Sequence, residues 1–417
     1  MDNALLSVMV MLSMILVLEG NRVRSLFLHI IAFVLKACAL ALRSVPVRRR
    51  VAFMSRQGRS GSMDFRILQE ALRERMPQVE LVECVTDPET KDLLKFTGNT
   101  LRQLRLSQTS SLVVVDGYLP AVSVPAKRKG VTVIQLWHAL GAIKRFGYQC
   151  LDTTDGRSSD SARILRMHRN YDYVIAGGPW ACEALAKAFD VPAETVLPLG
   201  LPRLDYLISP EFAEERSRVR ARILARYPQL SQPGPKVVLA PTFRRNDARF
   251  SARQLALACD AARGLAATVI FSGHPLDASG KDGDLPDNVV LASGFSTIQL
   301  LLVADALVTD YSAVAYEAAA MGLPVLFYVP DIDAYRKTPG LNIDPEAEYP
   351  QCTSRSLQAC LSLACSKSSR GDVLAESMGD VPEGCIDSIL ALVGHALMPN
   401  GDDGPSSGRA AGAREDH

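Results

Sequence analysis

Polar side chains follow several apolar runs of this chain at the same relative position, just past the end of each run. His138 follows the run Val131–Leu136, and His274 follows the run Thr268–Phe271. In an open parallel sheet the carboxyl ends of the strands meet at one edge, where ligands bind. A histidine at such an edge can act as a general base, which is the predicted catalytic role of His138, and His274 has the parallel position in the second half of the chain. A lone histidine is also commonly a structural group, and that alternative stays open.

A second group of residues at run ends is typical of phosphate binding. The stretch 305–324 predicts a strand through Val308 and then a helix over Ala313–Met321 capped by Ser312. The amino end of such a helix presents free N–H groups and a positive dipole end, although an ordinary capped helix fits the same pattern. The residues that we predict to bind a phosphorylated substrate are Lys144, Arg203, Thr242, Arg244, Thr309, Asp310, Ser312, Ala313 and Glu317, with Glu317 reaching a ribose.

These residues need a scaffold, and the alternation of strand, turn and helix from Val51 onward supplies one. It predicts an α/β fold with two Rossmann-like halves facing a central cleft. We place the first domain at residues 48–208 and the second at 209–398, after a helical segment at 1–47. Residues 399–417 are rich in Gly, Ser, Asp and Ala and are expected to be disordered. Gly58-x-x-Gly61 is not the Gly-x-Gly-x-x-Gly pattern, so an NAD-type site is poorly supported.

Composition excludes several classes of function. A chain of 417 residues predicts two domains, and its formal net charge of +1 gives no general reason to expect nucleic acid as a partner. The nine cysteines form no Cys-x-x-Cys pair and no Cys/His cluster at zinc spacing. We therefore expect reduced thiols, no metal site and no cofactor.

The N-terminal segment predicts contact with a membrane. Leu5–Leu18 is apolar but short for a bilayer span, and Ser25–Leu42 is apolar with polar positions at intervals of seven. Those positions, which share one side of a helix, are Arg22, His29, Lys36 and Arg43. With Arg48–Arg50 following, the pattern favours a helix in the interfacial plane of the cytoplasmic leaflet. A core helix and a spanning hairpin are the alternatives.

Six motifs together resemble a known family over roughly residues 50–395. In chain order they are Gln135-Leu-Trp-His138-Ala-x-Gly-Ala-x-Lys144-x-Phe-Gly147, Gly200-x-Pro-Arg203, Ala240-Pro-Thr-x-Arg244, His274-Pro275, Thr309-Asp-Tyr-Ser312 and Phe327-Tyr-x-Pro-Asp-x-x-x-Tyr-Arg336. The set resembles the CDP-glycerol glycerophosphotransferase family of teichoic-acid synthesis. The resemblance implies a GT-B-like arrangement of two Rossmann-type domains, peripheral on the cytoplasmic face of the cell membrane. It also implies that His138 is the base, that His274 is a second essential histidine, and that residues 309–312 hold the donor phosphates.

Some positions depart from the family pattern. The chain reads Trp-His-Ala-Leu-Gly where many polymerases of the family read Trp-His-Gly-Thr-Pro, and Ala313 stands where a second serine is frequent. No long extra N-terminal module is present in this sequence. These departures favour a primase-like member that adds a single unit.

The predicted reaction is transfer of glycerol phosphate or ribitol phosphate from CDP-glycerol or CDP-ribitol to a lipid-linked sugar or glycerol-phosphate acceptor, with release of CMP. His138 would deprotonate the acceptor hydroxyl, while His274, Arg244 and Ser312 would stabilise the pyrophosphate. Two alternatives share the architecture: a GT-B glycosyltransferase that uses a nucleotide sugar, and a non-catalytic membrane-bound scaffold that binds a nucleotide.

Overall fold

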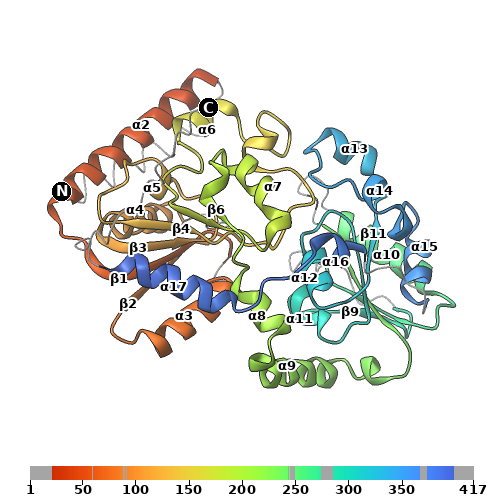
Figure 1. Ribbon diagram of the computed structural model, residues 1–417. Helices are drawn as coiled ribbons and strands as arrows, with labels where there is room; N and C mark the ends of the chain where they lie inside the picture. Colours follow the sequence, from red (N-terminus) through yellow and green to blue (C-terminus); the bar gives the residue numbers. More distant parts are fainter. Residues whose placement is uncertain are drawn as a thin grey trace, which may run out of the picture.

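The computed structural model describes residues 21–58, 60–87, 90, 92–242, 244, 249–273, 285–366 and 373–398. Within them the chain forms two domains, each built on a six-stranded sheet (Figure 1). Every strand pair in both sheets is parallel. The predicted α/β class with two Rossmann-type domains is therefore confirmed.

The first sheet has the strand order β2-β1-β3-β4-β5-β6. Val51 and Phe53 pack into one apolar cluster and Ala52 and Met54 into another, as expected for a strand buried on both faces. The strands are β1 (Arg48–Ser55), β2 (Glu80–Val85), β3 (Ser110–Val115), β4 (Thr132–Gln135), β5 (Tyr173–Ile175) and β6 (Val196–Leu197). The helices are α2 (Asn21–Ala41), α3 (Met63–Arg75), α4 (Leu93–Thr109), α5 (Pro120–Ser123), α6 (Ser159–Ile164), α7 (Pro179–Phe189) and α8 (Pro202–Ile208).

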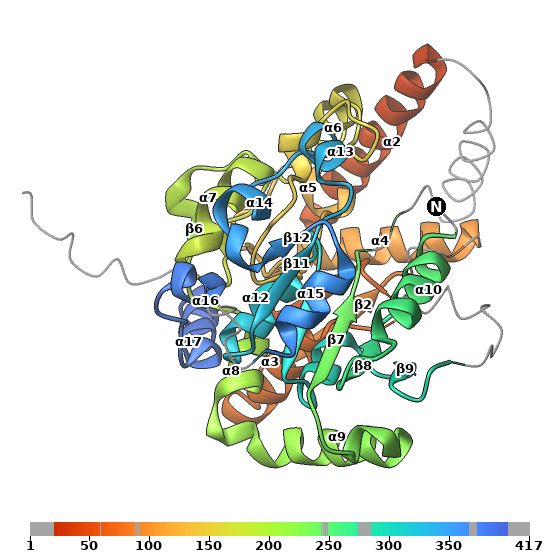
Figure 2. The ribbon, with the colours of Figure 1, turned by 90° about the vertical axis from the view of Figure 1, so that its right-hand side faces the viewer.

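The second sheet has the order β12-β11-β10-β7-β8-β9. Helices α10 and α15 cover one face and α11 and α12 the other, and Figure 2 shows this domain toward the viewer. The strands are β7 (Lys236–Ala240), β8 (Thr268–Phe271), β9 (Val289–Leu291), β10 (Ala306–Thr309), β11 (Val325–Tyr328) and β12 (Thr353–Ser354). The helices are α9 (Ala213–Arg226), α10 (Phe250–Ala262), α11 (Thr297–Leu301), α12 (Val314–Ala320), α13 (Ile332–Lys337), α14 (Pro345–Glu348), α15 (Leu357–Ala364) and α16 (Val373–Met378).

Helix α17 (Cys385–Leu397) corrects the predicted domain boundary. We placed residues 209–398 in the second domain, but α17 packs against β3, α3 and α8 of the first. Asp205 anchors the start of this helix, because its carboxylate accepts hydrogen bonds from the N–H groups of Cys385 and Ile386 at 3.1 and 2.7 Å. The chain therefore crosses between the domains twice, and the apolar core runs continuously through the junction.

Helix α2 lies along the outer side of the first domain (Figure 1). Phe27, Leu35 and Ala39 are buried, and the helix packs on α4 and α6. The predicted apolar side is thus divided: Leu35 and Ala39 cover the protein's own core, whereas Leu26, Phe33 and Leu40 are exposed. Of the predicted basic residues, Arg50 also differs: it is 8% exposed and bonds the hydroxyls of Ser110 and Thr109. The predicted apolar segment Leu5–Leu18 and the tail 399–417 lie outside the described residues.

Candidate functional site

His138 lies at the carboxyl edge of the first sheet, directly after β4. Its Nδ1 is 3.0 Å from the carbonyl oxygen of Asp116, which follows the neighbouring strand β3. That carbonyl can only accept, so Nδ1 carries the proton and Nε2 keeps its lone pair. Burial lowers the pKa of His138 to about 4, so the ring is neutral at pH 7. Among the described residues nothing hydrogen-bonds Nε2, and His138 is therefore available as a base.

Trp137 fixes the direction in which His138 points. Its backbone φ is +55°, in the left-handed region that a bulky residue seldom adopts. The side-chain amide oxygen of Gln135 accepts the Trp137 N–H at 2.9 Å, and the indole packs on Phe146 and Phe189. Backbone strain held by surrounding packing is characteristic of functional sites.

Asp116 adds a buried carboxylate beside this histidine. Its side chain is fully buried, and burial raises its pKa to about 7, although the nearby hydroxyls of Ser55 and Ser62 offset part of that rise. Neither carboxylate oxygen has a well-formed hydrogen bond to a described residue. The position of Asp116 could have been predicted, because it directly follows the apolar run of β3.

Four of the predicted residues meet at the carboxyl edge of the second sheet. Asp310 is the centre of this group: its Oδ1 accepts the N–H and the hydroxyl of Thr242 at 2.8 and 2.5 Å. Its Oδ2 accepts from Arg244 at 2.8 Å. The Thr309 hydroxyl donates to the Ala240 carbonyl at 2.7 Å. The structure brings these four residues together, but their polar groups bond mainly to each other.

Arg244 occupies a more enclosed position than we predicted. Its guanidinium also reaches Asp331 at 3.2 Å and the carbonyl of Thr242, and it stacks on Tyr335 with 4.5 Å to the ring centre. Phe250 lies 4.6 Å away. Both terminal nitrogens of Arg244 therefore already have acceptors in this structure. Asp331 was missed as a partner, although the motif from Phe327 to Arg336 contains it.

Backbone N–H groups at the start of α12 are available as hydrogen-bond donors. The helix begins at Val314 rather than at Ala313 as predicted, and the Val314 N–H approaches the Ser312 hydroxyl oxygen at 3.4 Å. Among the described residues no acceptor is found for the backbone N–H groups of Ser312 and Ala313. These two N–H groups, with the Ser312 hydroxyl, suit a phosphate oxygen.

Arg203 and Glu317 were predicted to bind substrate, but the structure buries both. Arg203 donates to Asp64 Oδ2 through Nε at 2.9 Å and to Glu317 Oε1 at 2.7 Å. Arg203 is 6% exposed and Glu317 is 2% exposed. Glu317 therefore does not lie open to a ribose here; instead this triad joins α3 and α8 of the first domain to α12 of the second.

Further contacts hold the two sheet edges together. Tyr316 packs so closely on Gly141 that a Cβ at that glycine would lie 2.4 Å from its ring. Lys144, predicted to bind substrate, is exposed and pairs through its backbone with Leu341. A cavity of about 470 Å³ opens beside this bridge, and its lining includes Trp180 and Arg145.

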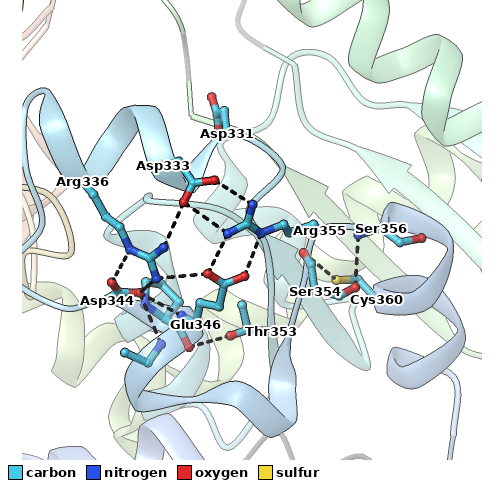
Figure 3. A network of polar contacts seen from close by, with 12 residues as sticks. Asp331, Asp333, Arg336, Asp344, Glu346, Thr353, Ser354, Arg355, Ser356 and Cys360 are labelled. Atoms are coloured by element: carbon cyan, nitrogen blue, oxygen red, sulfur yellow. Dashed lines mark hydrogen bonds and ion pairs between the residues drawn. The ribbon is translucent and has the colours of Figure 1, made fainter.

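A network of ion pairs on the second domain supports the segment that makes these contacts (Figure 3). Arg336 bonds Asp344 at 2.7 Å and Glu346 at 3.0 Å. Arg355 bonds Glu346 at 2.7 Å and Asp333 at 2.7 Å. The network ties α13 and α14 to the end of β12, and so it holds the intervening loop 338–344 against the first domain.

Two further predictions concern His274 and metal binding. His274 lies outside the described residues, so its role remains a prediction. Within the described ranges, no group of three or more His, Cys, Asp or Glu side chains could hold a metal ion.

Two Rossmann-type sheets whose carboxyl edges face each other define the class of GT-B-like proteins. The family model described as CDP-Glycerol:Poly(glycerophosphate) glycerophosphotransferase matches residues 37–370. The chain belongs to this family.

Relatives in sequence agree with this assignment, and a solved structure shares the fold. The teichoic acid ribitol-phosphate primase of Bacillus spizizenii is 35% identical over 231 residues, covering 54% of this chain and 58% of that protein. The glycerol-phosphate primase of the same species is 30% identical over 240 residues, covering 56% and 59%. These alignments span less than two thirds of each relative. The wall teichoic acid polymerase TagF shares the fold, with a TM-score of 0.66 at 18% identity over 91% of this chain and 98% of that one.

Proposed function

We propose that this protein transfers glycerol phosphate or ribitol phosphate from a CDP-alditol to a hydroxyl of a lipid-linked acceptor and releases CMP. One observation carries the proposal: the neutral His138, with Nε2 unoccupied, stands on the sheet edge that faces the open N–H groups of Ser312 and Ala313. A base and an anion-binding helix start on opposing domains suit in-line attack on a bound pyrophosphate.

The proposed reaction moves one proton and exchanges one bond to phosphorus. The acceptor hydroxyl gives its proton to Nε2 of His138, and its oxygen bonds to the β-phosphorus of the donor. The bond from that phosphorus to the bridging oxygen breaks, and CMP leaves with the electron pair. The N–H groups of Ser312 and Ala313 would stabilise negative charge on the phosphoryl oxygens. Negative charge bound beside His138 would also raise its pKa toward the operating pH.

The donor identity is supported by the family, while the fold alone does not decide it. A UDP-GlcNAc 2-epimerase from Neisseria meningitidis shares the fold with a TM-score of 0.55 at 12% identity, covering 84% of this chain and 99% of that one. We propose a single addition, because Ala313 removes a hydroxyl from the donor-binding turn and the two primases named above are relatives.

We also propose that α2 brings the protein to the membrane surface from the cytoplasmic side. Leu26, Phe33 and Leu40 are each more than 60% exposed and recur every seven residues. The exposed His29 and Lys36 lie between them along the same side. Residues 23–44 are long and apolar enough to cross a bilayer by length and composition, but α2 is docked on the first domain. An apolar and basic outer side suits the interface.

The proposed activity is tested by incubating the protein with CDP-glycerol, CDP-ribitol or a UDP-sugar, each with a membrane lipid extract. CMP release that depends on both a CDP-alditol and the extract is expected, with alditol phosphate recovered in the lipid fraction. Release of a nucleoside diphosphate with a glycoside product would establish the glycosyltransferase alternative. Donor binding without any turnover would establish the scaffold alternative.

A further inference from the structure

Two arginines of the first domain lie near the base but take no part in the site described above. Arg56 directly follows β1, and Arg157 precedes α6. Strand β1 is separated from β4 only by β3, and Met54, Val115 and Gln135 are in register across the three strands. Two strand spacings amount to about 10 Å, so the end of β1 lies within a short substrate's length of the loop that carries His138.

Aromatic rings hold both guanidinium groups in place. The Arg56 guanidinium carbon lies 5.3 Å from the centre of the Phe96 ring, and that of Arg157 lies 5.2 Å from the centre of the Tyr118 ring. The Tyr118 hydroxyl donates to the Leu165 carbonyl at 2.9 Å, which fixes that ring. Stacking on a ring face leaves the N–H edges of a guanidinium free for a ligand.

Neither arginine has an anionic partner in the part of the chain that the structure describes. No carboxylate there lies within ion-pair distance of Arg56 or Arg157, and no hydrogen bond from either guanidinium is found. Burial and the positive charge of Arg157 both lower the pKa of Arg56. Arg56 is partly buried whereas Arg157 is exposed, so the burial cost falls on Arg56, and an anion bound between the two groups would offset both that cost and their repulsion.

Other arginines that are buried or partly buried differ from Arg56 in having polar partners. Arg203 pairs with two carboxylates, Arg244 pairs with two more, and Arg50 bonds two hydroxyls. Arg56 is partly buried but has no such hydrogen-bonded or anionic partner among the described residues.

The surroundings indicate which anion belongs there. Phe96 is on α4, and Arg157 stands two residues before α6; both helices pack against α2, whose outer side is the proposed membrane contact. The unoccupied N–H groups suited to the donor phosphates are on the other domain, at the start of α12. An anion between Arg56 and Arg157 would therefore belong to the molecule that arrives from the membrane.

We propose that Arg56 and Arg157, stacked on Phe96 and Tyr118, form a phosphate subsite for the acceptor. The subsite binds a phosphate ester or pyrophosphate of the acceptor and so directs the acceptor's free hydroxyl to His138. This assignment rests on the proposed function for its acceptor, but the presence of an anion site can be measured without turnover.

The first test measures binding in the absence of donor. Equilibrium dialysis with radiolabelled glycerol 3-phosphate and with inorganic pyrophosphate is run on the wild type and on Arg56→Gln, Arg157→Gln and the double variant. Each substitution removes a charged hydrogen-bond donor, so each should weaken binding of the preferred probe about tenfold or more. Arg163→Gln is the matched control, because Arg163 is exposed on α6 and its ion pair in the described part of the chain is with the exposed Asp160. Equal binding by the wild type and the double variant would overturn the subsite, whether or not the protein has transferase activity.

The second test assigns the subsite to acceptor or donor. In the transferase assay both glutamine variants should raise the KM for acceptor about tenfold or more, while the Kd for CDP-glycerol is unchanged. Arg56→Lys and Arg157→Lys keep the charge and should restore part of the acceptor affinity. If CDP-glycerol binding falls and the acceptor KM does not change, the arginines serve the donor and the proposal fails. A wild type that binds the probes through these arginines but releases no CMP would refute the proposed function alone.

Discussion

The buried triad of Arg203, Asp64 and Glu317 shows how a single residue acts differently from its predicted role. We predicted that Arg203 binds substrate because it follows an apolar run, and that Glu317 does because it lies in the helix that begins near Ser312. Neither position reveals what the side chain contacts. Asp64 is 139 residues before Arg203 in the chain, and no local pattern links the two. The sequence predicts that such residues gather at one edge, whereas their pairing depends on tertiary contacts.

Loss of Arg203 should destabilise the fold strongly. Arg203→Met leaves two buried carboxylates without their partner, and breaking such a pair costs about 3–5 kcal/mol. Urea unfolding followed by circular dichroism measures the change in the free energy of unfolding. Arg218→Met is the control, because its pair with Glu214 is exposed and worth about 0–1 kcal/mol. Similar small losses in both variants would show that the triad contributes little to stability.

Asp116 should make stability depend on pH in a defined direction. Burial raises its folded-state pKa to about 7, so the folded protein holds a proton on Asp116 that the unfolded chain releases near pH 4. The stabilising contribution of that proton is present below pH 4 and is lost as the pH rises toward 7. Asp116→Asn cannot ionise, so it should gain stability relative to the wild type on going from pH 4 to pH 8. The gain should be a few kcal/mol at about 1.4 kcal/mol per pKa unit, measured by urea unfolding. An equal pH dependence in both proteins would mean that Asp116 ionises normally.

Among the elements, strands were predicted best and helix limits least well. The apolar runs of β1, β7 and β8 identified the strands, whereas β6 and β12 have only two residues each and give no periodic signal. The limits of helix α4 are hard to predict, because buried polar residues such as Thr97 and Ser107 interrupt its apolar pattern. Helix α2 was predicted from heptad spacing, but the pattern could not show that its apolar side covers α4 and α6.

The outer side of α2 should control membrane binding without affecting the fold. Three exposed arginines follow α2 in the chain, and replacing Arg43, Arg48 and Arg49 by Gln should weaken binding to anionic liposomes and reduce its salt sensitivity, at about 1 kcal/mol per basic residue. Arg50 is left intact because it is buried. Replacing Leu26, Phe33 and Leu40 by Ser should also weaken binding, since these side chains are exposed. Liposome co-sedimentation measures both effects.

A matched substitution on the inner side of α2 distinguishes an effect on membrane binding from an effect on stability. Leu35→Ser alters a residue that is 1% exposed and should lower the free energy of unfolding, whereas the outer-side variants should unfold like the wild type. If the outer-side variants remain in the membrane fraction through high salt and carbonate washing, the interfacial placement of α2 is wrong.

For the whole molecule, the relation between the two domains is the least predictable feature. The sequence predicts two domains and a cleft, but the packing of α17 on the first domain and the contacts of Tyr316, Gly141 and Leu341 across the junction are long-range. These contacts set the distance between the base and the start of α12. Catalysis by this arrangement requires His138 to act on an acceptor while the donor is held by the other domain.

The role of His138 as the base is tested most directly by measuring both donor affinity and turnover for His138→Ala. The Kd for CDP-glycerol is measured by calorimetry, and CMP release is measured with saturating donor and acceptor. We predict an unchanged Kd and a turnover lowered about 10²–10⁴-fold, since only proton transfer to the base is lost. His395→Ala, which removes an exposed histidine at the end of α17, should match the wild type in both. Near-normal turnover by His138→Ala would contradict the proposed mechanism.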